Sequence, residues 1–137
     1  MFDIVEAPFD MAALVTAVCE AGSGGLVTFV GYVRDRSDEG LPVEGLHYEA
    51  HRELALAELH KVGTEAVERF GIARIAIVHR VGELVVGEAA VGIAVSATHR
   101  GPAFEACQFA IDELKRRVPI WKKERYVAGD ARWRENA

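Results

Sequence analysis

Cationic side chains gather in one late segment of this sequence, where they could bind an anion. Residues 115–125 hold six Lys or Arg residues and one Glu, a net charge of +5, while the whole chain carries −5 and the rest therefore −10. Proteins that bind polynucleotides usually spread positive charge over a whole face. A compact basic segment on an acidic chain better fits a small anion such as a phosphate, or an acidic tail of a partner. Alternatively, Arg116 and Arg117 complement the negative end of a helix dipole and the other cations are solvated.

Two lysines of this segment, Lys115 and Lys122, could act on one ligand. Apolar residues at helical spacing predict a helix that begins near Pro102 and is stopped by Pro119. Lys115 falls beside the apolar stripe, so its alkyl stem can lie on the core while its ammonium reaches a cleft. The chain leaves in another direction after the helix. The two lysines therefore converge only if the chain folds back around Pro119.

Two further cations, Arg34 and Arg36, follow a strand that the sequence predicts at residues 26–33. A loop rich in Asp, Ser, Gly and Pro comes next, and a returning strand is predicted at residues 43–50. Arginines at a strand end can bind a phosphate with two parallel hydrogen bonds. They can equally pair with the acidic residues of the loop, which are Asp35, Asp38 and Glu39. The sequence leaves both alternatives open.

Neither a metal site nor a cysteine nucleophile is expected. Cys19 and Cys107 stand at small-residue positions of predicted helices without a CxxC pattern, and both are predicted to be buried thiols. His47 and His51 are four residues apart but straddle a strand-to-helix junction, so they do not share the helical face that a metal pair needs. The glycine run at 22–25 lacks the Lys and Ser/Thr of a phosphate-binding loop. We therefore expect no metal and no cofactor.

The remaining pattern predicts the elements that must position these side chains. Asp10 can cap a first helix, and Gly71 can end a second one. The apolar runs at 72–78 and 91–95 predict two strands that pair like a hairpin. The predicted helices lie at about 11–21, 51–70 and 102–118, and a short β tail follows at 126–134. This alternation of strand pairs and helices favours an α+β fold with helices against a largely antiparallel or mixed sheet.

Length and composition fit a single domain over residues 1–137. Half of the residues are apolar, and a chain of 137 residues can bury roughly two thirds of its extended surface. No apolar run approaches the roughly 20 residues of a membrane span, and the acidic N-terminus lacks the basic start of a signal peptide. We expect a cytoplasmic protein. Trp121 and Trp133, near exposed strand edges, are compatible with a homodimer.

Five segments in order carry a resemblance to a known family: 29–34 (FVGYVR), 79–84 (HRVGEL), 96–100 (SATHR), 114–115 (LK) and 118–124 (VPIWKKE). Over residues 25–134 the chain resembles the large, catalytic subunit of molybdopterin synthase. The resemblance implies an α/β hammerhead with an additional antiparallel β subdomain. It also implies a homodimer at the core of a heterotetramer, with a small ubiquitin-like sulfur carrier at each end.

The reaction that this resemblance implies is a sulfur transfer. Sulfur moves from the C-terminal thiocarboxylate of the carrier to cyclic pyranopterin monophosphate and forms the dithiolene of molybdopterin. Because the attacking sulfur belongs to the carrier, neither cysteine of this chain needs activation. A lysine that transfers protons needs a pKa lowered toward neutrality, which neighbouring cations favour and a bound phosphate opposes.

Site residues follow from the resemblance by motif position. Lys115 resembles the principal catalytic lysine and Lys122 the second. The implied substrate-binding residues are Tyr32, Val33, Arg34, Lys115, Lys122, Lys123 and Glu124, with His99 and Arg100 contributed by the other subunit. Tyr32 is a departure, because relatives often have a basic residue there. We expect structural or interface roles for His79 and Arg80. The alternative function is a noncatalytic dimer module that binds a phosphate ligand in the same basic pocket.

Overall fold

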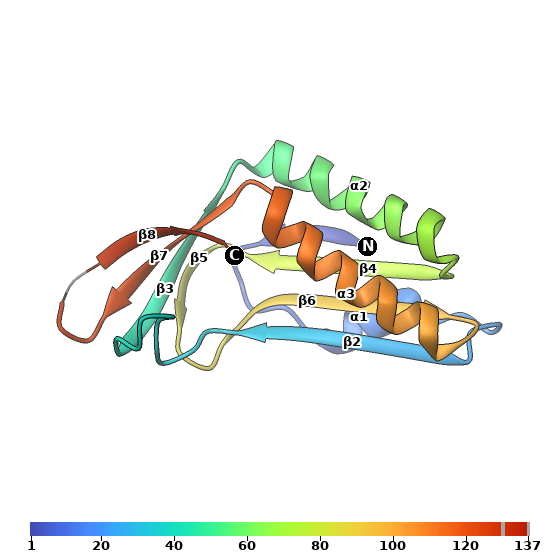
Figure 1. Ribbon diagram of the computed structural model, residues 1–137, viewed down its shortest axis with the longest axis horizontal. Helices are drawn as coiled ribbons and strands as arrows, with labels where there is room; N and C mark the ends of the chain where they lie inside the picture. The colour runs from blue at the N-terminus through green and yellow to red at the C-terminus, as the bar shows by residue number, and fades with distance from the viewer. Residues whose placement is uncertain (130, 137) are drawn as a thin grey trace.

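Two four-stranded sheets organise the part of the chain that the computed structural model describes, residues 1–129 and 131–136 (Figure 1). The first sheet has the order β1 (Phe2–Val5), β4 (Arg74–Arg80), β6 (Ala89–Ala97), β2 (Gly25–Tyr32), with β1 parallel to β4 and the other pairs antiparallel. The second sheet is antiparallel throughout, in the order β5 (Gly82–Val85), β3 (Val43–Ala50), β7 (Ile120–Tyr126), β8 (Ala131–Glu135). The predicted α+β class with an additional antiparallel sheet is confirmed.

Helices cover both faces of the first sheet. In Figure 1, α2 (Arg52–Phe70) and α3 (Arg100–Arg117) lie over one face, and α1 (Met11–Val18) lies behind the sheet. β4 shows the reason, because Ile75 and Ile77 join the large core with α2 and α3, while Ala76 and Val78 pack with α1. A strand buried on both faces reads as a continuous apolar run rather than an alternating one.

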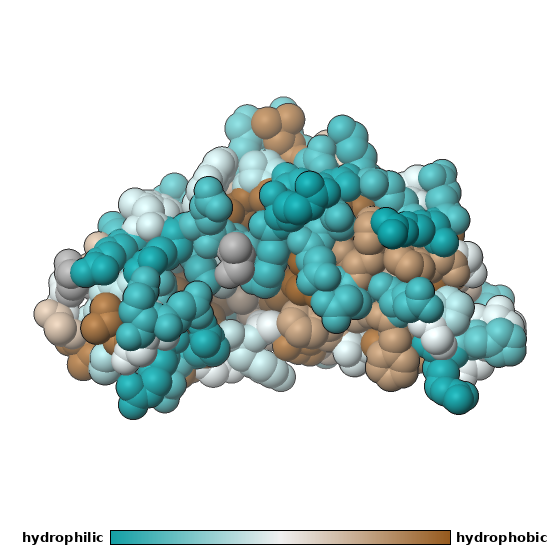
Figure 2. Space-filling model, viewed as in Figure 1, coloured by the Kyte–Doolittle hydropathy of each residue, from teal (hydrophilic) through white to brown (hydrophobic). Residues whose placement is uncertain are grey.

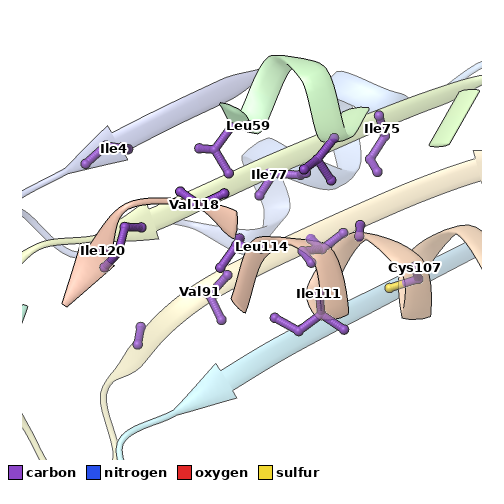
Figure 3. Close-up of a cluster of buried hydrophobic side chains, with 14 of the residues drawn as sticks. Ile4, Leu59, Ile75, Ile77, Val91, Cys107, Ile111, Leu114, Val118 and Ile120 are labelled. Carbon is purple, nitrogen blue, oxygen red and sulfur yellow. The ribbon is translucent and has the colours of Figure 1, made fainter. Parts of the chain in front are cut away.

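The large core lies between the first sheet and the two long helices. Figure 3 shows Leu59 of α2 and Ile111 and Leu114 of α3 pointing toward side chains of β4 and β6. Leu59 is fully buried and Leu114 nearly so. Burying a leucine of this kind stabilises the fold by roughly 1.5–3 kcal/mol. This packing fixes the last turn of α3, which carries Lys115.

The helix ends differ slightly from the predicted ones. Asp10 caps α1 as predicted, with its carboxylate accepting a hydrogen bond from the Ala12 N–H at 3.0 Å. The helix ends at Val18 instead of near residue 21, because Cys19 is already extended. Gly71 ends α2 with a φ of 64°, as predicted. α3 begins at Arg100, before Pro102, which is tolerated because the first-turn N–H groups have no partner within the helix.

Two sequence-based expectations are wrong. The strand predicted to return at 43–50 does not pair with the preceding one, since β2 pairs with β6 and β3 lies in the second sheet between β5 and β7. Cys19 is exposed, because the shortened α1 leaves it just outside the helix. Cys107 is buried as predicted, and burial raises its thiol pKa to about 11.

Two other expectations hold. β4 and β6 pair antiparallel, with Ile77 opposite Ile93, as the hairpin-like prediction required. The β tail predicted at 126–134 is present as β8, which pairs antiparallel with β7 and places Trp133 opposite Lys123. Among the described helices, none is long and apolar enough to cross a membrane.

Candidate functional site

A cavity of about 140 Å³ lies where residues of the two sheets and the last turn of α3 meet. The residues that line it come from β2 and the loop after it, from β3 and β7, from β4 and β6, and from α3. Its lining residues are Phe29, Gly31, Tyr32, Arg34, Arg36, Val43, Leu46, Tyr48, His79, Ala90, Val91, Lys115, Lys122, Glu124 and Asn136.

Positive charge dominates this lining. Within the described part of the chain, the lining contains a single carboxylate, that of Glu124, and four cations, which are Arg34, Arg36, Lys115 and Lys122. Glu124 is already paired, with its Oε1 lying 3.2 Å from Nε of Arg134. The fold-back that the sequence required is present, because β7 begins directly after Pro119 and brings Lys122 to the cavity that Lys115 lines. Such a cavity is suited to an anionic ligand.

Lys115 occupies an environment that disfavours its charge. Its pKa is lowered, first by partial burial and then by repulsion from Lys122 and Arg34, while Asp38 opposes the shift. Its Nζ donates a hydrogen bond of 3.5 Å to Oδ1 of Asn136. A lysine with a lowered pKa gives up its proton more readily near neutral pH, which suits it to proton transfer.

His79 and Tyr48 form a neutral part of the cavity wall. Burial is the main reason that the pKa of His79 falls to about 4, with repulsion from Lys115 adding to it. Burial, assisted by the charge of Glu124, raises the pKa of Tyr48 to about 12. The two rings meet edge to face with centroids 5.0 Å apart. Both groups are therefore neutral near pH 7.

Arg34 and Arg36 reach the cavity from the loop between β2 and β3. Nη2 of Arg34 lies 2.7 Å from Oδ1 of Asp38, so Arg34 makes one of the acidic pairings that the sequence allowed. Arg36 donates a hydrogen bond of 3.3 Å to the carbonyl of Gly40. The side chains of Arg34 and Asp38 are 63% and 82% exposed, and an ion pair so exposed contributes little to stability. An anionic ligand can therefore replace Asp38 as the partner of Arg34.

The other implied site residues divide between the cavity and its surroundings. Tyr32 and Glu124 line the cavity. Val33 is buried and its N–H donates to the carbonyl of Glu88 at 2.9 Å. Lys123 points to the opposite face of β7, where its Nζ lies 5.6 Å from the centroid of the Trp133 ring.

His99 and Arg100 lie beside Gly25, at the start of β2, whereas Tyr32 at its end borders the cavity. Seven residue steps along a strand span about 23 Å. In Figure 1, α3 runs along the first sheet from that far end toward the second sheet. Within one chain, therefore, Arg100 does not reach the cavity.

Several contributors to the site were not among the residues that the sequence implied. Arg36 was noticed only as a companion of Arg34, and the sequence gives Tyr48 no special spacing. Asn136 is 3% exposed and touches Lys115. Arg80 pairs with Glu88 at 3.0 Å, consistent with a structural role. Within residues 1–129 and 131–136, no group of three or more His, Cys, Asp or Glu residues is arranged to hold a metal ion.

Comparisons with known proteins agree with one another. The sequence model described as "MoaE protein" matches residues 4–117. A molybdopterin synthase catalytic subunit from Pyrococcus abyssi is 46% identical over 116 residues, which are 85% of this chain and 78% of that protein. The catalytic subunit from Emericella nidulans is 44% identical over 119 residues, 87% of this chain and 60% of that longer protein. A crystal structure of molybdopterin synthase from Staphylococcus aureus, 36% identical, superposes with a TM-score of 0.91 and covers 97% of this chain and 96% of that one. The chain therefore belongs to the MoaE protein family, the family of molybdopterin synthase catalytic subunits.

Proposed function

We propose that this chain transfers sulfur from the C-terminal thiocarboxylate of a small ubiquitin-like carrier subunit to cyclic pyranopterin monophosphate, and so forms the dithiolene of molybdopterin. The observation that carries the proposal is the convergence of cations from distant parts of the sequence on one cavity. Arg34 comes from the loop after β2, Lys115 from α3 and Lys122 from β7. Their charges suit a ligand that bears a phosphate.

The residues divide the chemical work in this proposal. The carrier supplies the nucleophilic sulfur, so the chain itself must bind the substrate, stabilise developing negative charge and move protons. Arg34 and Lys122 hold the phosphate. Lys115 has the lowered pKa that proton transfer requires. His79 is neutral near pH 7 and therefore contributes no charge to these steps.

The small size of the cavity supports a binding site to which one chain contributes only a part. Pockets that bind small molecules usually enclose about 300–1,000 Å³, whereas this cavity encloses about 140 Å³. Arg100 and His99, which the family resemblance assigns to substrate binding, lie at the other end of β2. We propose that a second copy completes the site with its own Arg100 and His99.

An exposed apolar surface on β2 and α3 supports this dimer. β2 is an edge strand of the first sheet, and Figure 2 shows hydrophobic surface gathered over α3 and along β2. Its large exposed side chains are those of Leu26, Phe29, Tyr32 and Phe104. Two copies related by a two-fold axis near the middle of β2 would place Arg100 of each copy near Tyr32 of the other.

The proposed reaction is tested with purified protein, thiocarboxylated carrier and cyclic pyranopterin monophosphate. We expect the wild-type chain to form molybdopterin and Lys115→Ala to lose activity while retaining its fold. The matched control is Lys61→Ala, which removes a lysine of α2 that pairs with Glu58 at 3.3 Å. Ligand binding without turnover by the wild-type chain would instead indicate the noncatalytic phosphate-binding module.

The shared site is tested by mixing Lys115→Ala with Arg100→Ala, which should weaken substrate binding, at a substrate concentration at which neither variant alone forms product. In a mixed dimer, one site carries both substitutions and the other carries neither. With free subunit exchange, half of the dimers are mixed and half of their sites are intact, so activity should return to about a quarter of the wild-type value. Mixed dimers that remain inactive would contradict a site built from two chains.

A further inference from the structure

A short hydrogen-bond chain connects Lys115 to the buried interior. Nζ of Lys115 donates to Oδ1 of Asn136 at 3.5 Å, and Nδ2 of Asn136 lies 3.2 Å from Nε2 of His79. Nδ1 of His79 lies 2.6 Å from the backbone carbonyl oxygen of Arg80. Both Asn136 and His79 are buried, at 3% and 1% exposure. The hydrogen-bond chain therefore runs through side chains that have almost no exposure to solvent.

The carbonyl group of Arg80, at the buried end of this series of hydrogen bonds, determines which atom donates and which accepts in each of them. A carbonyl oxygen only accepts, so Nδ1 of His79 carries the proton that it donates to Arg80. Since the ring is neutral, its Nε2 is an acceptor and must receive a hydrogen bond from Nδ2 of Asn136. This fixes the amide of Asn136 in one orientation. Its carbonyl oxygen then faces Lys115, as an acceptor for the ammonium.

We propose that Asn136 is a positioning residue for Lys115, and that His79 sets the orientation of its amide. The carbonyl oxygen of Asn136 holds Nζ of Lys115 at the cavity wall, and within residues 1–129 and 131–136 it is the one neutral hydrogen-bond partner of this ammonium. A reversed amide would direct its N–H dipoles at the ammonium and repel it. The catalytic consequence rests on the proposed function, whereas the contact itself can be tested in the protein alone.

The charged groups that face Lys115 come from each element packed around it. Lys122 of β7 and Arg34 of the β2–β3 loop disfavour its charge, and Asp38 of the same loop favours it. Glu124 of β7 and Arg36 of the β2–β3 loop line the same cavity, and so do His79 of β4 and Tyr48 of β3. Arg116 is its neighbour on α3 but pairs with Glu113 at 2.5 Å. Against this background, a change at Asn136 alters the nearest hydrogen-bond partner without altering the surrounding cations.

The test measures the reactivity of Lys115 directly. Trace acetylation with acetic anhydride, followed by peptide mass spectrometry, reports the fraction of neutral Lys115 as the pH is varied. Asn136→Asp places a carboxylate beside the ammonium and should shift the curve to higher pH, because the pKa of Lys115 rises. Asn136→Leu removes the acceptor and should shift it to lower pH. His79→Phe should shift it in the same direction as Asn136→Leu, because the amide loses its fixed orientation.

The matched control is Glu135→Gln, one residue earlier and opposite Trp121 in the β7–β8 hairpin. Its labelling curve should coincide with that of the wild-type chain. If the curves of Asn136→Asp and Asn136→Leu also coincide with the wild type, Asn136 has no influence on Lys115 and the inference is wrong. Asn136→Asp keeps the test valid if a bulkier variant fails to fold.

Turnover gives a second readout. Asn136→Leu should lower kcat roughly tenfold, as expected for losing a hydrogen bond to a charged group, with KM for the pterin substrate changed less than about twofold. A tenfold rise in KM with unchanged kcat would contradict positioning of the catalytic lysine. If the wild-type chain forms no product, the proposed function fails while the labelling result still stands. If the wild type is active and the labelling curves coincide, only the role of Asn136 fails.

Discussion

Replacing His79 by glutamine should change how the stability of this protein depends on pH. The ring of His79 is 1% exposed, and burial lowers its folded pKa from 6.5 to about 4. Between these two values the unfolded chain binds a proton that the folded chain does not. Stability therefore falls as the pH is lowered through this range.

The size of the effect follows from the two pKa values. A folded pKa of about 4 against 6.5 in the unfolded chain lowers the free energy of unfolding by about 2 kcal/mol between pH 7 and pH 5. His79→Gln is less stable than the wild type at pH 7, because it loses the ring contact with Tyr48. It does not titrate in this range. The stability gap between the two proteins should thus narrow by about 2 kcal/mol at pH 5.

Urea unfolding followed by tryptophan fluorescence, at pH 7 and pH 5 and at one protein concentration, measures this gap. All other titrating groups are common to both proteins and cancel in the difference. Tyr48→Phe is the matched control, because it alters the same ring pair and its pKa of about 12 keeps it neutral at both pH values. A gap for His79→Gln that stays constant while the pH falls would refute the reasoning that His79 is buried in its neutral form.

Two further predictions concern the ion pairs around the site. Arg117→Met should lower the free energy of unfolding by about 1–2 kcal/mol in urea titrations. The side chain of Arg117 is 22% exposed and joins Glu58 of α2 to Glu113 of α3. It also pairs with Glu65. Arg116→Met removes a 69% exposed arginine and should change the free energy of unfolding by less than about 0.5 kcal/mol. Equal losses of stability in the two variants would argue against a stabilising role for the ion pairs of Arg117. Asp38→Asn should release Arg34 and strengthen the binding of inorganic phosphate a few-fold in calorimetric titrations at low salt. The control is Asp35→Asn, which makes the same charge change outside the Arg34–Asp38 ion pair. Equal gains in both variants would mean that net charge alone governs binding.

Local spacing was sufficient to predict the helices and the placement of Lys115. The apolar stripe of α3 determines which side faces the sheet, and Lys115 beside it must emerge at the edge of the core. The capping residues Asp10 and Gly71 act on residues close to them in the sequence, so the start of α1 and the end of α2 could also be predicted. In each case, the interactions that decide the structure lie within one or two helical turns.

The pairing of strands that lie far apart in the sequence could not be predicted from local spacing. β2 and β3 follow each other and both have strand-like sequences, yet they belong to different sheets. The choice depends on β6, which pairs with β2, and on β7, which pairs with β3, and both lie far along the chain. Asn136 was missed for a related reason. Only the register of β8 against β7, with Trp121 opposite Glu135, brings it under Lys115.

The cavity described above draws its walls from Phe29 through Asn136, and its β3–β7 wall joins Tyr48 to Lys122. Because β7 and β8 follow α3 in the sequence, α2, β4, β6 and α3 leave the ribosome before the last segments that line the cavity. The capacity to bind substrate arises only when β7 and the residues after it have been synthesised and have docked. A polypeptide released before β7 is made would therefore lack Lys122 and Glu124 of the cavity lining.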